Sequence, residues 1–379
     1  MDAHRMTVLQ VLPALEGGGV ERGVLEIAEA LTAAGHRSLV VSAGGRMVRE
    51  LTHHGSEHFT CPVGAKSPMT LRWVPWMRRL MVREGVDIVD IHSRLPGWIT
   101  LLAWKSLPPA LRPRLISTVH GLHSVSRYSG VMCSGEVVIV VSETVREYVR
   151  QNYPWVQESQ LRLVHRGIDG SEYPRGFQPD VAWKRSFSGQ FPLAAAQPLI
   201  MLPGRITRLK GHQDFLTMMA RLRDSGVAGH GLIVGGAETS KAGYLEEIRQ
   251  LIGQMGLQER ITLTGHRADL KELYAISRVV VSLSQTPESF GRTVAEALSV
   301  GTPVVGYAHG GVAEILAAQF PSGAVPCGCI TELADRVEQI LSRRIPLVIG
   351  PNAFEKSDML RKTLQEYTEV THGSRRAAA

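Results

Sequence analysis

The chain has 379 residues, of which 44% are hydrophobic and 20% are charged, and its formal net charge is +7. The length suggests two domains, and the composition is that of a globular protein, not a disordered or fibrous one. The basic charge fits phosphate-bearing ligands, an anionic membrane face or ordinary solubility. No Lys/Arg run with interleaved aromatics and no zinc-finger or helix-turn-helix spacing is present, so we expect no nucleic-acid partner.

The cysteines and the first residues bear on the compartment. The four cysteines form no C-x-x-C pair, which favours free thiols in a reducing compartment. Met1 runs directly into an apolar strand without the hydrophobic core of a signal peptide, and no stretch reaches about 18 predominantly apolar residues. We expect a cytoplasmic protein, either free or bound peripherally at the inner face of the membrane. A basic predicted helix over 69–84, with Trp73 and Trp76, could provide loose contact with an anionic membrane, or it could pack its aromatics inward.

Strands alternate with helices along the first half of the chain. Short apolar runs predict strands at 6–12, 38–42, 86–91, 114–119, 136–141 and 161–164. Between the first strand and a helix over about 20–34 lie Gly17, Gly18 and Gly19. Such glycines let a backbone approach a ligand at a helix N-terminus, although a tight turn without a ligand is the alternative.

Two of these strands end in histidines. His92, Ser93 and Arg94 follow the strand at 86–91, and His120 follows the strand at 114–119. The carboxyl ends of parallel strands form the ligand-binding edge of a doubly wound sheet. A single histidine at a strand end is often structural, but two at successive strand ends favour a functional site.

A second alternating series begins after residues 170–197, whose prolines and glycines predict an interdomain linker. Its predicted strands are 199–202, 231–234, 261–263, 279–283 and 304–305, and its predicted helices are 212–223, 241–255, 269–277, 332–342 and 352–370. We expect residues 371–379 to be a frayed tail. The two series predict an α/β protein with two parallel-sheet domains, 1–185 and 195–350.

The stretch 284–314 carries the strongest functional signal. Glu288 lies in a loop after Pro287, and a predicted helix over 291–300, with Glu296 on it, ends at Gly301. The first helical turn, from about Phe290, offers free N–H groups to an anion such as a diphosphate. Carboxylates on either side could accept hydrogen bonds from sugar hydroxyls, which is the layout of a nucleotide sugar.

Two cations in the same predicted domain fit this ligand. Arg205 and Lys210 lie between a strand and a helix, in a turn bracketed by Gly204 and Gly211. An arginine can grip a phosphate as a fork and a lysine as a point charge. Taken alone they could be solvated surface charges, but Glu288 favours a ligand.

These motifs resemble the retaining GT-B glycosyltransferases of family 4, over nearly the whole chain and most strongly at 204–211, 287–296, 301–305 and 310–314. The resemblance implies two Rossmann-like domains facing a central cleft, with residues 351–379 forming a C-terminal helix and tail that cross back to the first domain. It also implies a hexosyl- or heptosyltransferase that moves a sugar from a nucleotide-diphosphate sugar to an acceptor hydroxyl with retention. The expected donor is a UDP-sugar, and no metal or other cofactor is expected.

The resemblance also implies residue roles. Arg205 and Lys210 would neutralise the diphosphate, and Glu296 would bind the ribose. His120 and Glu288, which would contact the transferred sugar, are the expected catalytic residues. The expected donor-binding set is Gly18, Gly19, Arg205, Lys210, Arg267, Glu288, Ser289, Phe290, Gly291, Arg292 and Glu296.

The acceptor follows from a weaker resemblance. His92, Ser93 and Arg94 are the expected acceptor-binding residues, and they look like those of a subgroup acting on lipopolysaccharide core or related glycolipids. The chain departs from the family at Arg166, where many members carry asparagine in an Asn-Gly-Ile-Asp motif. A nucleotide-sugar 2-epimerase and a catalytically silent sugar-nucleotide-binding protein of the same fold are the alternatives.

Overall fold

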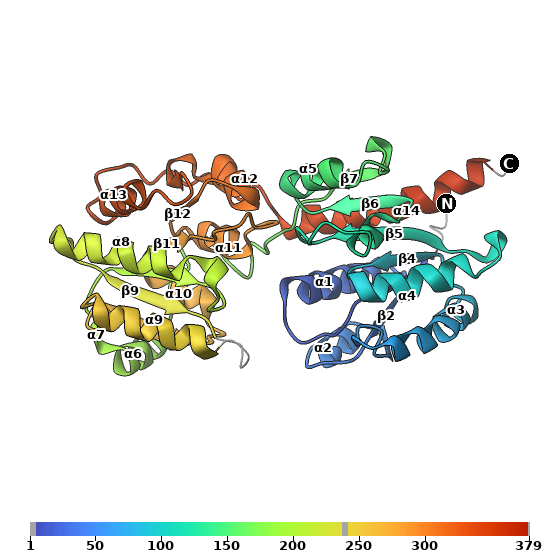
Figure 1. Ribbon diagram of the computed structural model, residues 1–379, viewed down its shortest axis with the longest axis horizontal. Coiled ribbons are helices and arrows are strands. Elements are labelled where there is room, and N and C mark those ends of the chain that lie inside the picture. The colour runs from blue at the N-terminus through green and yellow to red at the C-terminus, as the bar shows by residue number, and fades with distance from the viewer. Residues whose placement is uncertain (1–4, 237–241, 378–379) are drawn as a thin grey trace. The chain divides into compact units, whose positions relative to one another are not determined.

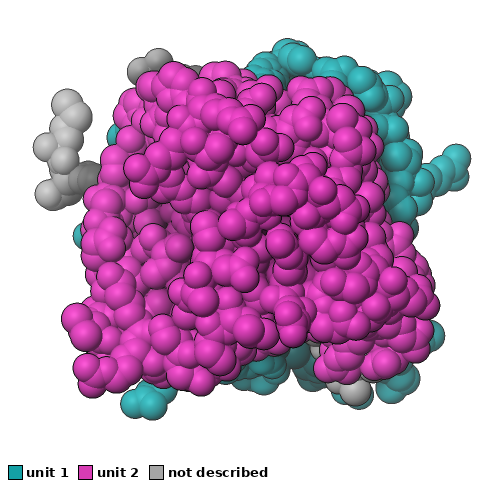
Figure 2. All heavy atoms as spheres, turned by 90° about the vertical axis from the view of Figure 1, so that its left-hand side faces the viewer, with its two compact units in different colours: residues 1–166, 357–379 teal, residues 167–356 magenta. Residues whose placement is uncertain are grey.

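The structure is a computed structural model that describes residues 5–236 and 242–377 and divides into two compact units. Unit 1 comprises residues 1–166 and 357–379, and unit 2 comprises residues 167–356 (Figures 1 and 2). Each unit holds one sheet of parallel strands, which confirms the predicted α/β class with two Rossmann-like domains. The boundary at Arg166–Gly167 precedes the proline-rich segment in which we placed the end of the first domain.

The sheet of unit 1 has seven strands in the order β3-β2-β1-β4-β5-β6-β7. Val8 of β1 lies between Ser38 of β2 and Ile88 of β4 in the register. Because both faces of the sheet are covered, its central strands are almost continuously apolar. The strands are β1 (Thr7–Val11), β2 (Arg37–Ser42), β3 (Glu57–Thr60), β4 (Ile88–Ile91), β5 (Arg114–Val119), β6 (Val137–Val140) and β7 (Leu161–Leu163).

The helices of unit 1 form a layer on each face of this sheet (Figure 1). They are α1 (Gly19–Ala33), α2 (Val48–His53), α3 (Trp73–Arg83), α4 (Arg94–Lys105), α5 (Glu143–Asn152) and α14 (Lys356–Ala377), with 3-10 turns at Pro68–Arg72, Pro109–Leu111, Ser129–Cys133 and Glu158–Gln160. Helices α1 and α14 contribute to one buried cluster and α3 and α4 to another. Among the described residues, no helix is long and apolar enough to cross a membrane.

Helix α14 belongs to unit 1 from Ser357 onward, although it follows unit 2 in the chain. Its Met359, Tyr367 and Val370 are buried in the cluster that includes Val8 and Ile88. The predicted frayed tail is wrong for residues 371–377, because the helix continues to Ala377; residues 378–379 lie outside the described part.

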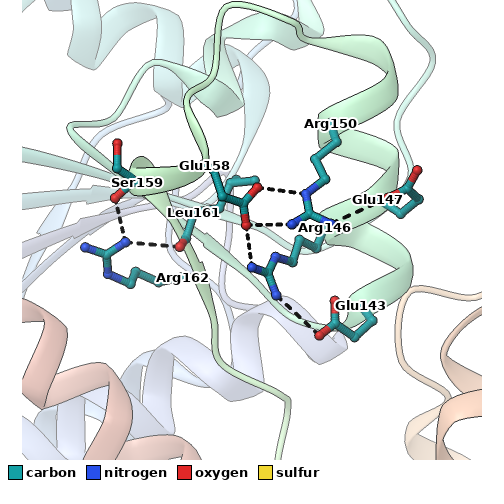
Figure 3. Close-up of polar contacts among 8 residues, drawn as sticks. All are labelled: Glu143, Arg146, Glu147, Arg150, Glu158, Ser159, Leu161 and Arg162. Atoms are coloured by element: carbon teal, nitrogen blue, oxygen red, sulfur yellow. Dashed lines mark hydrogen bonds and ion pairs between the residues drawn. The ribbon is translucent and has the colours of Figure 1, made fainter.

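The turn before β7 is tied to α5 by an ion-pair cluster (Figure 3). Glu158 accepts hydrogen bonds from both Arg146 and Arg150, and Arg146 also reaches Glu143 at 3.4 Å. The bonds from Arg150 and Arg146 lower the pKa of Glu158 to about 2. These side chains are exposed or half-exposed, so the cluster fixes local geometry and contributes little to global stability.

The sheet of unit 2 has six strands in the order β10-β9-β8-β11-β12-β13. They are β8 (Leu199–Pro203), β9 (His230–Val234), β10 (Ile261–Gly265), β11 (Ser277–Ser282), β12 (Val304–Tyr307) and β13 (Ala324–Val325). The helices are α6 (Val181–Gln190), α7 (Pro192–Ala195), α8 (His212–Asp224), α9 (Ala242–Gln254), α10 (Leu270–Ile276), α11 (Arg292–Val300), α12 (Gly310–Gln319) and α13 (Ile330–Leu341), with 3-10 turns at Arg208–Lys210 and Pro321–Gly323. Lys241, where we expected α9 to begin, lies outside the described residues.

Residues 170–197 do not form the expected linker, because they contain α6 and α7 and belong to unit 2. Asp180 caps α6 by accepting a hydrogen bond from the Trp183 N–H, and Phe187 is buried in the core of unit 2. Pro192 begins α7, a position at which the missing N–H costs nothing. Two of the prolines that suggested a linker, Pro179 and Pro192, therefore lie at helix starts, whereas Pro174 lies in an irregular stretch before α6.

Candidate active site

A glycine turn in unit 2 brings Lys210 to the loop after β11. Gly211, at φ +70°, precedes α8, and a Cβ added there would lie 2.0 Å from the carbonyl oxygen of Leu283. Only glycine fits that approach. The backbone N–H of Gln285 also donates to the carbonyl of Leu209 at 2.8 Å. The turn after β8 and the loop after β11 are therefore packed together, as expected for neighbouring parallel strands.

Lys210 and Glu288 form an ion pair in this loop. The Lys210 Nζ donates to Oε1 of Glu288 at 2.7 Å, and the Ser284 hydroxyl donates to the same oxygen. Burial by itself would raise the pKa of Glu288, but the charge of Lys210 and the bonds from Lys210 and Ser284 hold that pKa below its usual value. Both side chains remain partly exposed, at 29% and 22%. The strand edge thus presents an ionised carboxylate beside a cation.

Close backbone packing holds the Glu288 loop against the start of α12. The N–H of Gly311 donates to the carbonyl oxygen of Glu288 at 2.7 Å. A Cβ on Gly310, at φ +61°, would lie 2.6 Å from that oxygen, and a Cβ on Gly311 would lie 2.4 Å from the Cα of Phe290. His309 reaches the carbonyl of Ser284 at 2.7 Å. The predicted Gly310-Gly311 motif therefore allows this contact.

Glu296 is buried in α11, with 5% of its surface exposed. One carboxylate oxygen accepts from Arg292 Nε at 3.0 Å, and the other accepts from the hydroxyl of Tyr274 at 2.9 Å. Burial raises the pKa of Glu296 above its usual value, although Arg292 and Tyr274 oppose that shift. Both oxygens already have protein donors, so a ribose at Glu296 would have to share or displace one of them.

The remaining residues of the expected donor loop have distinct surroundings. Phe290 is buried and packs edge-on against Phe354, so only its backbone can face a ligand. Gly291, at φ +101°, is the N-cap of α11, and Ser289 is half-buried. The helix begins at Arg292, close to the predicted start.

Arg205 and Arg267 lie at the same edge of the sheet, because they follow β8 and β10. Arg205 is exposed beside Gly204, which has φ +140°. Arg267 forms an ion pair with Asp269 at 2.5 Å and donates to Gln190 at 3.1 Å. Protein groups thus already bind the Arg267 side chain. In the sheet order, β9 lies between β10, which Arg267 follows, and β8, which Arg205 follows.

In unit 1 the two predicted histidines meet at the ends of β4 and β5. The Nδ1 of His92 lies 2.8 Å from the Nε2 of His120, with nearly parallel ring planes and ring centroids 5.1 Å apart. Arg166 Nη2 lies 2.9 Å from the Nδ1 of His120 and 3.4 Å from the carbonyl of Gly19. The His92 side chain has no exposed surface and lies behind His120. We expected His92 to contact the acceptor, but in this structure its ring contacts His120 and Asp90.

Behind His92 lies a carboxylate that sequence reasoning did not select. Asp90 Oδ2 lies 3.5 Å from His92 Nε2 and accepts a bond from the Tyr367 hydroxyl at 2.7 Å. Thr118 also donates to Asp90 at 3.0 Å. A fully buried aspartate in an apolar strand, two positions before a histidine, is a signal that could have been noticed.

The other predicted residues of unit 1 lie at the same sheet edge. Gly18 is the N-cap of α1 and Gly19 its first residue. Ser93 is the N-cap of α4, and the Arg94 guanidinium donates to Ser129 Oγ at 3.3 Å and lies over the ring of Tyr128. β1 and β4 are neighbours in the sheet, so the glycine loop and His92-Ser93-Arg94 follow adjacent strands.

Two family models match successive parts of this chain. "Glycosyltransferase Family 4" matches residues 17–172, and "Glycosyl transferases group 1" matches residues 184–358. Together they cover the second sheet, the first sheet except for β1, and both strand-end sites. The chain belongs to the family-4 type of glycosyltransferases.

Relatives of this glycosyltransferase match it over most of its length. An uncharacterized glycosyltransferase of Methanocaldococcus jannaschii is 26% identical over 324 residues, 79% of each chain. The N-acetyl-alpha-D-glucosaminyl L-malate synthase of Bacillus anthracis is 23% identical over 286 residues, covering 72% of this chain and 70% of that protein.

Solved structures share the fold of this chain. A glycosyltransferase from Rickettsia africae has a TM-score of 0.86 at 27% identity, over 97% of this chain and 99% of its own. The HepE protein of Anabaena, in complex with UDP and glucose, has a TM-score of 0.79 at 20% identity, over 96% of this chain and 100% of its own. The second likeness concerns the fold alone.

Proposed function

We propose that this glycosyltransferase moves a sugar from a UDP-sugar to an acceptor hydroxyl with retention at the anomeric carbon. The observation that carries the proposal is the Lys210–Glu288 ion pair at the strand edge of unit 2. Such a pair offers a cation to a diphosphate and a carboxylate to sugar hydroxyls within the same few ångströms.

The donor roles follow from these groups. Lys210 and Arg205 neutralise the diphosphate, and Glu288 accepts hydrogen bonds from the transferred sugar. Among the described residues, the bonds to the Glu288 side chain go to Oε1, which leaves Oε2 for the ligand. Glu296 and Arg267 are the proposed contacts of the ribose and the base, and each would exchange a protein partner for the nucleotide.

Glu288 binds the sugar and does not act as a glycosidase acid or nucleophile. Its ion pair with Lys210 keeps it anionic, and a general acid needs a proton to give. In the proposed step the bond from the anomeric carbon to the diphosphate oxygen breaks while the acceptor oxygen bonds to that carbon on the same face. The leaving diphosphate takes the acceptor proton, and Arg205 and Lys210 stabilise its charge without a metal ion.

The proposed acceptor is a lipopolysaccharide-core or other cell-envelope glycolipid with anionic groups. Helix α3 supports a loose contact with an anionic membrane face, because Arg78, Arg79 and Arg83 are exposed beside the exposed Val82. The Bacillus anthracis relative is named for a small soluble acid, L-malate. Acceptor assays should therefore include soluble anionic acceptors as well as lipid-linked ones, and transfer to soluble acceptors alone would refute the glycolipid proposal.

A thermal-shift panel of UDP-, GDP- and ADP-sugars tests the donor proposal. A ligand that binds only the folded chain raises the free energy of unfolding by mass action, by about 2.7 kcal/mol at a ligand concentration of 100 times Kd, and the melting temperature rises with it. We expect UDP-sugars to raise it in the presence of EDTA and Lys210→Met to reduce that shift. The matched control is Arg208→Met, an exposed cation of the same turn that pairs with Glu247. No shift with any donor would refute the proposal.

Product analysis separates the alternatives. Incubation with donor alone should give only slow hydrolysis, whereas a 2-epimerase would convert the donor to its epimer. Binding without turnover in every acceptor assay would favour a silent sugar-nucleotide-binding protein.

Vesicle binding tests the membrane contact. We expect co-sedimentation with vesicles containing anionic lipid, and a loss with Arg78→Glu/Arg79→Glu, since each basic residue near the surface contributes about 1 kcal/mol. Arg221→Glu/Arg249→Glu makes the same charge change on unit 2 and should bind like wild type. Equal binding by both double variants would refute the role of α3.

A further inference from the structure

The histidine pair of unit 1 is part of a continuous chain of polar contacts that no expected role explains. The chain runs from Arg166 through His120 and His92 to Asp90, with separations of 2.9, 2.8 and 3.5 Å. Two hydroxyls, from Thr118 and Tyr367, converge on its last member. It therefore joins the strand-end site to the middle of α14, which lies far away in the sequence.

The hydrogen-bonding capacity of Arg166, at one end of this chain, determines which ring nitrogens of His120 and His92 carry a proton. A guanidinium can only donate, so the Nδ1 of His120 must accept from Arg166. A neutral His120 then carries its proton on Nε2 and donates it to the Nδ1 of His92. His92 in turn carries its proton on Nε2, which has no hydrogen-bond partner among the described residues but lies 3.5 Å from Oδ2 of Asp90, whose negative charge favours a proton there.

A charged imidazole fits neither position. A proton on the Nδ1 of His120 would face an N–H of Arg166, and a proton on the Nδ1 of His92 would face the N–H of His120. Burial, and then the charge of Arg166, lowers the pKa of His120 well below its usual value, while His123 adds a smaller effect of the same sign. Burial also lowers the pKa of His92, although the Asp90 charge opposes it.

We propose that Asp90 and His92 are positioning residues that hold His120 neutral with its proton on Nε2. Both ring nitrogens of His120 are then used within the protein. His120 therefore meets the transferred sugar through its ring carbons or its backbone, and it exchanges no proton with the substrate. This consequence rests on the proposed function, whereas the protonation state itself does not.

Nuclear magnetic resonance of the full chain with ring-¹⁵N-labelled histidine tests the protonation state without any substrate. We expect two rings that stay neutral with the proton on Nε2 from about pH 5.5 to 8.5, where an unperturbed histidine titrates. His92→Asn and His120→Asn identify them by the loss of their signals. A His120 ring that carries its proton on Nδ1, or that titrates near its ordinary pKa of about 6.5, would overturn the proposal.

Variants test whether the positioning matters. His92→Asn keeps an oxygen close to where Nδ1 accepts from His120, whereas His92→Leu removes the acceptor. We expect His92→Leu to let His120 exchange between its two neutral tautomers, and to lower kcat about tenfold with little change in the donor KM. His92→Asn should keep both the His120 tautomer and kcat close to those of wild type. Asp90→Asn removes the negative charge that lies 3.5 Å from His92 Nε2, so we expect it to weaken the preference for the Nε2 tautomer by less than His92→Leu does.

The matched control is His230→Leu, which removes another fully buried histidine, hydrogen-bonded to Thr262 in unit 2. It should lower stability and leave the two ring spectra and kcat unchanged. Unchanged kcat in His92→Leu, with the tautomer released, would overturn the positioning role. If no donor binds wild type, the proposed function fails while the spectra still decide the protonation state.

Discussion

At the strand-end edge of unit 1 the central groups are two histidines, of which His92 is buried and His120 partly buried, whereas at the same edge of unit 2 they are a lysine and a carboxylate that are both partly exposed. Both edges are built from βα units with glycine turns. In unit 1, burial disfavours the imidazolium, so the pKa values of His92 and His120 fall. In unit 2, Lys210 and Ser284 outweigh burial, so Glu288 stays ionised. Local burial and partners, not the fold, decide which of these four side chains is charged.

Carboxylates show the same contrast within unit 2. Glu288 has a cation and partial exposure, and its pKa lies below the usual value; Glu296 is buried, and its pKa lies above it. The two residues are eight positions apart in one motif and share a chemical group. This difference supports a substrate-binding role for Glu288 and a role for Glu296 that depends on Arg292 and Tyr274.

The largest expected effect is that of Glu288→Gln. The substitution keeps the shape but removes the charge beside Lys210, so we expect the transfer rate to fall by roughly 100-fold or more, the magnitude found when an electrostatic contact in an active site is lost. Initial rates with the donor from the thermal-shift panel measure it. Glu247→Gln, which breaks an exposed ion pair of the same unit, should leave the rate unchanged. A Glu288→Gln rate within about threefold of wild type would contradict the assignment.

Lys210→Met should have the next largest effect. Glu288 would lose the partner that lowers its pKa, and the donor diphosphate would lose a cation, so we expect donor affinity to fall about tenfold or more. The pKa of Glu288 should rise in this variant. Raising the pH to neutral should not restore the lost activity, because the cation that meets the diphosphate is missing. Calorimetric titration measures the affinity, with Arg208→Met as the control. Equal affinities in the two variants would contradict the role of Lys210.

Acidification should destabilise unit 1 through four histidines that are fully or partly buried. The pKa values of His58, His92, His120 and His123 lie below the usual value because of burial, so the unfolded chain binds protons more readily than the folded chain. Their contribution to stability is complete above the unfolded pKa of about 6.5 and falls as the pH drops below it.

Urea unfolding followed at about pH 7.5 and 5.5 measures this effect, with up to about 1.4 kcal/mol expected per group for each pH unit below 6.5. The variant His123→Asn should reduce the pH dependence, and substitution of the exposed His53 should not. An equal pH dependence in both variants would refute the attribution to buried imidazoles.

The smallest expected effects come from two buried hydroxyls, one in each unit. Tyr367→Phe removes a bond to Asp90 and Tyr274→Phe removes a bond to Glu296, and each should cost about 1–2 kcal/mol in free energy of unfolding. Tyr274→Phe should also weaken donor binding slightly, whereas Tyr367→Phe should not. Urea denaturation compares both with Tyr148→Phe, which loses a bond in a half-buried position. A cost no larger than that of the control would show that these hydroxyls are dispensable.

Local pattern was enough to predict the alternation of strands and helices and the helix that carries Glu296, because hydrophobic period, glycines and prolines are encoded within a few residues. The predicted helix at 291–300 begins within one residue of α11. The strand-end positions of His92, His120 and Lys210 followed from the same signals.

Long-range partners could not be predicted in this way. Asp90 and Tyr367 are 277 positions apart, and Tyr274 and Glu296 come from different helices, so no local spacing indicates these contacts. The Tyr367 hydroxyl that bonds to Asp90 comes from α14, which returns to unit 1 from the far end of the chain. Residues 170–197 were misassigned because prolines at helix starts resemble those of a linker.

The most direct test of the central claim is calorimetric titration of UDP, GDP and ADP into wild type and Lys210→Met, with EDTA present throughout. The account predicts that UDP binds wild type without metal and binds Lys210→Met about tenfold or more weakly. Absence of binding by all three nucleotides, or equal UDP affinity in the two proteins, would contradict it.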